Sequence, residues 1–302
     1  MRVDPNYVSN LVNALNQTQS NLQQIASEES SGVSFSSLGQ NPVASGENVR
    51  LLNNIQEDDS FTQTSSMVTG QLQVADTALG QVVSELTSAI SLATSANNGT
   101  MNSSDIQSIS KQLAGILDEV TTQANTSYQG QYIFAGSQTS TAPFSTSTTT
   151  SPATTTYSGD DDVNYLVTPS GQNIQLNVPG NQIFQGSGTS NVFSALNNLI
   201  ADYASGTVDT AKAVSDTTAL NTSLNYVSQQ RVTIDNSLTQ VSSASASATS
   251  DETQLTTART NLIQADFGTV ATQLSLAETQ QTALISLISQ LDSTSNTLFS
   301  KI

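Results

Sequence analysis

The sequence contains no cysteine, no histidine and no tryptophan. Without cysteine and histidine, the usual ligand sets for zinc, haem and iron–sulfur clusters are missing. Nucleophilic catalysis by a Ser-His-Asp or Cys-His arrangement is excluded for the same reason. No disulfide can form, so the redox compartment cannot be inferred from a bridge pattern. We therefore expect no catalytic residues, no metal site and no cofactor.

Charge is also scarce. Only 10% of the 302 residues are charged, against about 25% in an average soluble domain. Seven basic residues face 24 acidic ones, which gives a formal net charge of −17. With no cluster of basic residues, such a chain is repelled by nucleic-acid phosphates and by anionic membrane surfaces. Nearly half of the residues are Ser, Thr, Asn or Gln, so the expected surface is polar through amides and hydroxyls.

Long apolar runs are missing too. No stretch approaches the ~18 apolar residues of a membrane-spanning helix. Residues 1–6 lack the apolar core of a secretory signal peptide. We therefore expect a cytosolic protein, or one exported without a cleaved signal. The length of 302 residues predicts two structural units.

Each end of the chain carries one narrow apolar stripe. Apolar residues recur at steps of three, four, seven or, once, ten, the spacing that places them on one face of a helix. Isolated helices of this length are marginal in water. The stripes must therefore be buried against each other or against neighbouring copies, and we predict an assembly interface. Its residues are Val8, Leu11, Leu15, Leu22, Ile25, Leu274, Leu284, Ile288, Leu291 and Leu298.

Long helical patterns follow the first stripe and precede the last. Residues 30–46 contain Gly and Pro and predict a loop, with a second helix from about Glu47 to Asn97. Residues 104–107 have the form of a capping box that begins a third helix. Apolar residues then recur every seven positions from Leu220 to Leu262. A helix over about 209–262 would measure roughly 80 Å, which predicts a rod.

The middle of the chain has a different composition. From residue 139 to 156, 13 of 18 residues are Ser or Thr, which disfavours helix. Two runs with period-two alternation follow, at 163–167 and 174–178, separated by the turn at 168–171. Ile183-Phe184 could begin a third strand.

The predicted fold class is therefore mainly α with an inserted β domain, a long antiparallel helical rod or coiled coil plus a small β-rich domain. We divide it into an assembly helix and loop (1–45), a first half of the rod ending in a β-hairpin signature (46–138), a β-rich insert (139–188), a long returning helix (189–265) and a C-terminal assembly helix (266–302).

Three other features have simpler interpretations. Asp160, Asp162 and Asn164 have the first spacings of a calcium-binding EF-hand loop, but the required Gly and Glu are missing, so a solvated turn is favoured. Ser110-Lys111 lacks the spacing of a Ser-Lys nucleophile pair and is interpreted as surface. The Ser/Thr tract could carry O-linked sugars, although a plain polar loop or β edge is favoured.

The whole chain resembles the flagellin superfamily and, within it, the proteins of the hook–filament junction. The order of the parts agrees with that family, and four short motifs carry the resemblance. The first motif runs from Ser31-Gly32 to Asn41-Pro42, and the second is the G-x-Y-x-F-x-G signature Gly130-Gln131-Tyr132-Ile133-Phe134-Ala135-Gly136, followed by Pro143-Phe144. The third is Tyr157-Ser158-Gly159-Asp160, and the fourth is Ala265-Asp266-Phe267.

The resemblance implies a non-enzymatic structural subunit of the bacterial flagellum. Its implied partners are flagellin, hook-associated protein 1, further copies of itself in a ring, an export chaperone and the flagellar type III export apparatus. The implied location is the extracellular hook–filament junction. Flagellin itself is the nearest alternative. A coiled-coil surface adhesin and an enzyme are the others, but the first lacks a signal or anchor and the second lacks catalytic groups.

Overall fold

The computed structural model describes residues 5–35, 39, 41–147, 149, 151–186 and 191–299, without the side chains of 5–8 and 292–299. The predicted fold class is confirmed, because most of the described chain is helical and carries small antiparallel sheets. The chain divides into two compact units. Unit 1 comprises Met1–Gln56 and Asp251–Ile302, and unit 2 comprises Glu57–Ser250.

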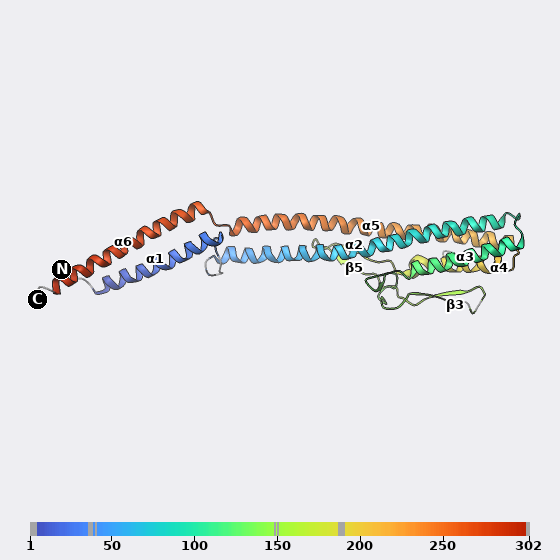
Figure 1. Ribbon diagram of the computed structural model, residues 1–302, viewed down its shortest axis with the longest axis horizontal. Coiled ribbons are helices and arrows are strands. Elements are labelled where there is room, and N and C mark those ends of the chain that lie inside the picture. Colours follow the sequence, from blue (N-terminus) through green and yellow to red (C-terminus); the bar gives the residue numbers. More distant parts are fainter. Residues whose placement is uncertain are drawn as a thin grey trace. The chain divides into compact units, whose positions relative to one another are not determined.

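Helices α2 and α5 contribute to both units, whereas the strands all belong to unit 2 (Figure 1). In chain order the elements are α1 (Pro5–Ser31), α2 (Pro42–Asn97), α3 (Ser103–Ala124), β1 (Ser127–Tyr128), β2 (Gln131–Tyr132), β3 (Phe144–Ser147), β4 (Thr154–Tyr157), β5 (Tyr165–Val167), β6 (Asn173–Gln175), the π-helical turn η1 (Asn181–Gln185), α4 (Val192–Ala204), α5 (Thr210–Ile263) and α6 (Phe267–Phe299).

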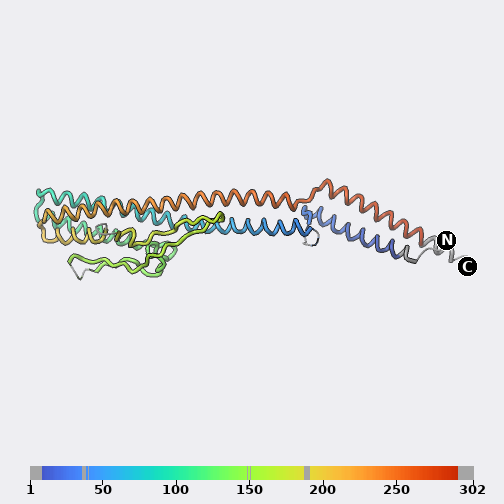
Figure 2. The backbone as a smooth tube through the Cα atoms, turned by 180° about the vertical axis from the view of Figure 1, so that it is seen from behind, coloured from blue at the N-terminus to red at the C-terminus, as the bar shows by residue number. Residues whose placement is uncertain are grey.

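The core of unit 2 is a seam between two antiparallel helices. Within this unit α2 and α5 run side by side in opposite directions (Figures 1 and 2). Heptad positions of both helices are buried in one cluster, because a seven-residue spacing keeps side chains on one helix face. They are Val68, Ala75, Leu72, Leu79, Val82 and Leu86 on α2, and Leu220, Val227, Ile234 and Val241 on α5. The predicted heptad pattern is confirmed over this stretch.

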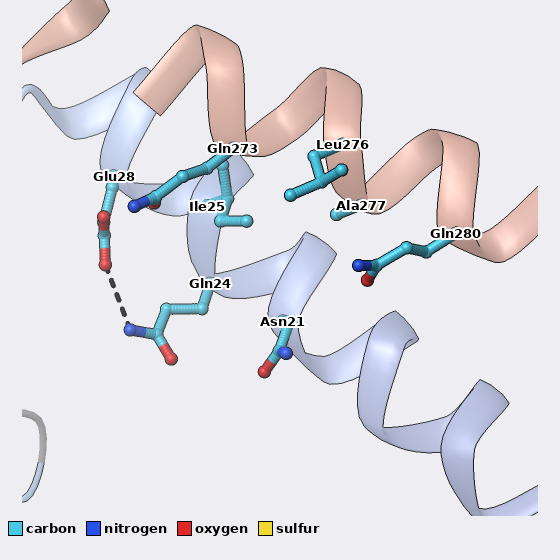
Figure 3. Close-up of a pocket in the computed structure, with 8 residues that line it drawn as sticks. All are labelled: Asn21, Gln24, Ile25, Glu28, Gln273, Leu276, Ala277 and Gln280. Atoms are coloured by element: carbon cyan, nitrogen blue, oxygen red, sulfur yellow. Dashed lines mark hydrogen bonds between the residues drawn. The ribbon is translucent and has the colours of Figure 1, made fainter. Parts of the chain in front are cut away.

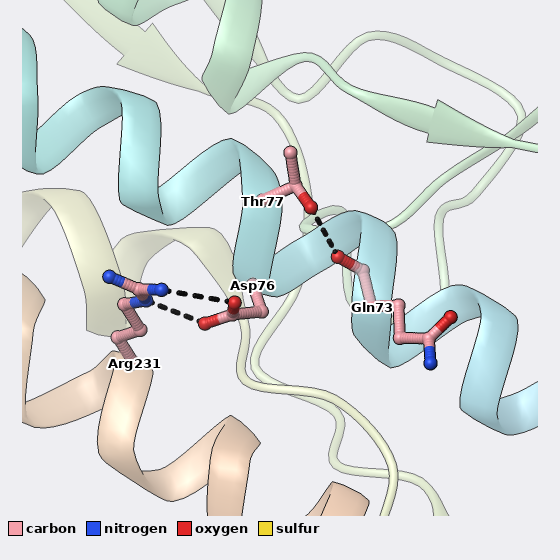
Figure 4. A network of polar contacts seen from close by, with 4 residues as sticks. All are labelled: Gln73, Asp76, Thr77 and Arg231. Carbon is pink, nitrogen blue, oxygen red and sulfur yellow. Dashed lines mark hydrogen bonds and ion pairs between the residues drawn. The ribbon is translucent and has the colours of Figure 1, made fainter.

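One ion pair fixes α2 to α5 within the seam (Figure 4). Arg231 Nε donates to Asp76 Oδ1 at 2.5 Å, and its Nη2 donates to Oδ2 at 3.1 Å. The guanidinium lies over Gly80, where an added Cβ would be in ordinary van der Waals contact at 3.5 Å from the guanidinium carbon. The hydrogen bond from Arg231 lowers the pKa of the Asp76 carboxyl, while burial and the charge of Asp76 raise the pKa of Asp235.

Aromatic side chains form the centre of the β region. Phe144 stacks with Tyr157, Phe184 and Phe193 at ring distances of 5.0–5.2 Å, and Phe134 meets Phe184 edge to face at 5.7 Å. The backbone N–H and C=O of Phe144 both bond to the side chain of Asn125, at 2.9 Å each. The second half of the G-x-Y-x-F-x-G signature, Ile133 to Gly136, is thus a buried packing element.

Three separate two-stranded antiparallel sheets complete unit 2. The Ser/Thr tract forms the β3–β4 hairpin, in which the Ser145–Thr156 and Thr146–Thr155 hydroxyl pairs bond across the strands at 2.9–3.0 Å. In β5–β6, Leu166 pairs with the buried Ile174. Tyr165 and Val167 consequently lie on the exposed face. The predicted turn between these strands is confirmed by Gly171, whose φ is +84°.

Several local predictions were wrong. Ile183 and Phe184 belong to the helical turn η1 and are fully buried, because the aromatic cluster takes up Phe184. Helix α2 begins at Pro42 instead of near Glu47, since proline is tolerated in a first turn and Asn41 Oδ1 accepts the Ala44 N–H at 3.1 Å.

Two further differences concern helix ends. The N-cap of α3 is Asn102, which accepts the Asp105 N–H, instead of Ser104. A separate helix, α4, precedes α5 and packs on α3. The chain turns between α4 and α5 at Gly206, whose φ is +76° and where a Cβ would lie 2.8 Å from the Ser103 carbonyl oxygen.

We predict that Arg231→Gln lowers the free energy of unfolding of unit 2 by about 1 kcal/mol at neutral pH, because the pair is partly screened by solvent. Since the pKa of Asp76 is depressed, the contribution of the pair is present above the carboxyl's unfolded pKa of about 4 and is lost as pH falls through the lower folded value. Urea titrations across this range measure both effects. Arg50→Gln removes an exposed pair with Glu47 in unit 1, and it should leave the stability of unit 2 unchanged.

A second prediction concerns close packing in the β region. A Cβ at Gly180 would lie 2.7 Å from both the Phe134 carbonyl oxygen and the Phe144 ring. Gly180→Ala should therefore destabilise unit 2 by roughly 1–3 kcal/mol. Gly115→Ala on α3 meets nothing within 4 Å and should stabilise by up to about 1 kcal/mol. Equal effects of the two substitutions in thermal unfolding would contradict this packing.

Candidate functional site

The terminal helices α1 and α6 pack against each other within unit 1. The predicted stripes face this contact, where most of their side chains are half-buried. These are Leu11, Leu15, Leu22 and Ile25 on α1, and Leu274, Leu284, Ile288 and Leu291 on α6. The side chains of Val8 and Leu298 lie outside the described residues. The structure therefore brings eight of the ten predicted residues to one helix pair.

Polar residues inside the stripe are satisfied locally. Thr18, the polar break in the α1 stripe, is buried, and its hydroxyl donates to the Ala14 carbonyl at 2.9 Å. On the exposed face of the same helix, the Gln24 amide donates to the Glu28 carboxylate at 3.0 Å. A hydroxyl can thus lie inside the stripe while its hydrogen bond is made to the backbone of its own helix.

The chain segment after α1 pairs with the link before α6 and so holds the two helices together. Ser34 N–H donates to the Ile263 carbonyl at 2.7 Å, and Ala265 N–H donates to the Gly32 carbonyl at 2.9 Å. Gly32 has a φ of +69°, which favours glycine at this bend. The Ser31-Gly32 and Ala265-Asp266 motifs are thus neighbours in space.

Asp266 caps the N-terminus of α6. Its carboxylate accepts the N–H groups of Gly268 and Thr269 and, at 2.9 Å, the Thr269 hydroxyl. The Thr269 hydroxyl, followed by the two backbone N–H groups, lowers the pKa of this carboxyl. The acidic residue of the link therefore has a local structural role, because it satisfies N–H groups that the helix leaves free.

A groove of about 300 Å³ lies along the contact between α1 and α6. Figure 3 shows Leu276 and Ala277 of α6 on one side and Ile25 of α1 on the other. The small Ala277 leaves space opposite Asn21, and amides of Gln273 and Gln280 border the opening. Its apolar floor and amide rim would accommodate an apolar side chain of a neighbouring molecule.

Further apolar side chains of this helix pair remain exposed, and the sequence analysis missed them. Val12 on α1 is 41% exposed, and on α6 Leu276, Ile285 and Leu287 are 59%, 51% and 44% exposed. Leu276 and Leu287 are eleven residues apart, about three helical turns, so they share one flank of the stripe. Ile285 lies on the other flank. The sequence does contain a sign of these flanks, in the run Leu284-Ile285-Ser286-Leu287-Ile288. One narrow stripe cannot contain all four apolar residues of this run, so some of them must lie beside the stripe.

Two other features are not found among the described residues, a metal-binding cluster and a membrane-spanning helix. No group of three or more carboxylates that could bind a metal ion occurs among the described residues. Asp160 instead accepts the Ser137 backbone N–H at 2.7 Å and the Ser137 hydroxyl, which holds two loops together. None of the helices in the described part combines the length and apolar composition needed to cross a bilayer.

Comparison with known proteins confirms the resemblance to the flagellin superfamily. Residues 6–139 match the family model described as the bacterial flagellin N-terminal helical region. Two curated relatives are both named flagellar hook-associated protein 3. The one from Escherichia coli is 31% identical over 34% of this chain and 33% of its own length. The one from Salmonella typhimurium is 26% identical over 45% of this chain and 44% of its own length. The chain thus spans less than half the length of the curated relatives it matches.

Solved structures support the same fold. A flagellar hook-associated protein from Vibrio parahaemolyticus superimposes with a TM-score of 0.67 at 18% identity, covering 74% of this chain and 100% of that one. The flagellar junction protein FlgL from Legionella pneumophila gives a TM-score of 0.58 at 15% identity, over 72% of this chain and 100% of that one.

The two units should differ in local stability. The largest fully buried side chains all belong to unit 2, whereas the α1–α6 contact is mostly half-buried. Limited proteolysis of dilute protein should therefore cut residues 5–35 and 267–299 before residues 57–250. Segments with less buried contact have a lower free energy of local unfolding, so a protease reaches them first. Mass spectrometry of the first fragments measures this order.

A pair of variants isolates the contribution of the stripe. Ile25→Asp places a charge in the contact and should speed cleavage of the terminal helices roughly tenfold. Val12→Asp changes an exposed position on the same helix and should leave the rate unchanged. Initial cleavage within 57–250, or equal rates for the two variants, would show that the stripes do not hold these helices together.

Proposed function

We propose that this protein is a non-enzymatic structural subunit of the bacterial flagellum, located at the junction between the hook-associated adapter and the flagellin filament. The observation that carries the proposal is the terminal helix pair with exposed apolar flanks. The relatives named flagellar hook-associated protein 3 support this location, and the solved flagellar junction protein shares the fold.

The apolar flanks are an incomplete surface. Leu276, Ile285 and Leu287 remain largely in water on a helix that otherwise presents amides and hydroxyls. Burying such side chains contributes about 1.5–3 kcal/mol each when it is complete. Because these side chains are already about half buried, neighbouring subunits that cover the flanks would gain roughly half of this free energy, whereas a free monomer does not.

The predicted stripes and the exposed flanks then have distinct roles. The stripes, from Leu11 to Ile25 and from Leu274 to Leu291, hold α1 against α6 within one subunit. The flanks and the groove beside Ala277 contact adjacent subunits, including further copies of this chain in a ring, flagellin and hook-associated protein 1. Specificity would come from shape, because the contact helices carry few charges.

Export is the second part of the proposal. We place the assembled protein outside the cell, as part of the flagellum, after passage through the flagellar type III export apparatus with an export chaperone and without a cleaved signal. The absence of cysteine and the small number of charges support this route. A chain with no disulfide and few buried ion pairs can be unfolded and threaded at low cost.

Flagellin, the bulk subunit of the filament, is the alternative. The family-model match to the flagellin N-terminal helical region favours it. The signature from Gly130 to Gly136, whose buried Phe134 joins the aromatic cluster, resembles the junction proteins and favours the first proposal. Long filaments formed by the purified protein alone would support flagellin.

Deletion of the gene tests the proposed location. Cells that lack a junction subunit should assemble hooks and release flagellin monomers into the medium, because nothing holds the first filament subunits. Electron microscopy of the cell surface and immunoblots of the medium measure both effects. Cells that keep full filaments would contradict the proposal, and cells that secrete no flagellin at all would favour a role in export or as the filament subunit.

Variants of the flanks test the proposed contacts. Leu276→Asp and Ile285→Asp should leave the circular dichroism spectrum and secretion unchanged, since both positions are exposed in the monomer. When produced in the deletion strain, each should reduce filament retention at least tenfold, because a buried unpaired carboxylate strongly opposes contact. Val232→Asp, at a 55% exposed position on α5 in unit 2, is the matched control. Normal swimming of cells with the α6 variants would rule out this interface.

A further inference from the structure

A second cavity lies entirely within unit 2, away from the terminal helices. It has a volume of about 320 Å³, close to the lower bound of roughly 300 Å³ for small-molecule sites. Helix α2 forms one wall, the β1–β2 hairpin the second, and the ends of the β5–β6 hairpin the third. Three elements far apart in the sequence therefore converge on one small space.

The lining has an unusual composition. It contains no Asp, Glu, Lys or Arg, and most of its members carry amides or hydroxyls. Two tyrosines, Tyr128 and Tyr132, and the thioether of Met67, a residue that is 54% exposed, supply apolar surface. Such a wall offers no charged side chain to pair with a phosphate, a carboxylate or a metal ion. It offers amide donors and acceptors beside aromatic rings.

The walls are fixed by backbone hydrogen bonds and by the buried side chain of Asn177, which is itself part of the lining. Asn177 is 4% exposed, and its amide accepts the Asn164 N–H at 2.7 Å and donates to the Asp162 carbonyl at 3.0 Å. Tyr132 N–H donates to the Thr139 carbonyl at 2.9 Å. Residues Gln129 and Gly130 form the tight hairpin turn with positive φ values of 51° and 81°.

One tyrosine is held by close approach to a helix. A Cβ at Gly70 would lie 2.5 Å from the Tyr128 hydroxyl oxygen, so only glycine leaves room for this ring on α2. In the part of the chain that the structure describes, the side chains of Gln71, Gln131 and Asn164 and both tyrosine hydroxyls make no hydrogen bond to protein. Because the walls are already formed and carry polar groups without protein partners, binding a ligand here requires little loss of conformational entropy.

We propose that this cavity binds a neutral saccharide of one or two rings. Pyranose rings present hydroxyl groups that donate and accept, which amides of Gln and Asn match. Their faces also present polarised C–H groups, which favour the electron-rich face of an aromatic ring. The lack of charge in the lining and the net charge of −17 exclude an anionic ligand as the preferred one.

Saturation-transfer NMR on the full chain tests this proposal. The probes are glucose, galactose, mannose and N-acetylglucosamine, each at millimolar concentration, with glucuronic acid as the charged comparison. At least one neutral sugar should receive saturation from the protein, and glucuronic acid should receive less than glucose. Absence of transfer to every neutral sugar, or stronger transfer to the acid, would overturn the proposal.

Variants place the binding in the cavity. Tyr132→Ala should weaken the affinity for the best sugar at least about fivefold, and so should Gln71→Ala, which is on a helix where alanine is well tolerated. Tyr165→Ala and Gln73→Ala change the same residue types at exposed positions outside the lining and should leave the affinity unchanged. Equal effects of the two sets would contradict the assignment.

A peptide is the competing occupant of an amide-lined space. A neutral pentapeptide of Gly, Ser and Asn, measured in the same experiment, separates the two ligand classes. The proposal expects weaker saturation transfer to the peptide than to the best sugar. Equal or stronger transfer would show that the cavity is a peptide site and that the saccharide assignment is wrong.

Discussion

Packing of helices through narrow apolar seams organises both units of this protein. In unit 2 the seam between α2 and α5 is complete, and positions such as Leu79, Val82 and Leu220 are fully buried. In unit 1 the seam between α1 and α6 is only half-buried, and apolar residues remain on its flanks. The same kind of contact thus yields a stable body in one unit and an incomplete surface in the other.

The polar groups of the chain adapt to this arrangement in a consistent way. Threonine and serine hydroxyls within the helices bond to the carbonyl one turn earlier, as Thr18 does in the α1 stripe. The ion pair of Arg231 and Asp76 is an exception, since it joins two helices through a charged contact. A protein with so few charges relies on shape and on amide and hydroxyl contacts, which suits both a helical interface and an uncharged ligand cavity.

Much of the fold could be predicted from the sequence. The heptad spacing of Leu220, Val227 and Ile234 predicted one long helix, and α5 begins and ends within a residue of the expected bounds. The side-chain period was sufficient there because a seven-residue spacing keeps the apolar side chains on one face of the helix. The first residues of α2 and α3 were harder to predict from the sequence. The start at Pro42 and the N-cap at Asn102 depend on the local backbone geometry and on cap hydrogen bonds, which the residue types alone do not determine.

The parts that failed depend on contacts between distant residues. The pair Ile183-Phe184 indicates a strand until Phe144 and Phe193 are known to surround it. Likewise, the stripe residues were identified, but only the pairing of α1 with α6 shows that they face each other. Because the stripe residues are half-buried between α1 and α6, the exposed Val12, Leu276 and Ile285 are the residues that a neighbouring subunit can contact.

The most direct test of this central claim is the accessibility of single cysteines, which the chain permits because it contains none of its own. Leu276→Cys and Ile285→Cys would be labelled with a maleimide in the free protein and in intact flagella. The account predicts rapid labelling of the monomer and at least tenfold slower labelling in flagella, because neighbouring subunits cover the flanks. Equal rates in the two states would show that the flanks stay in water and that the interface lies elsewhere.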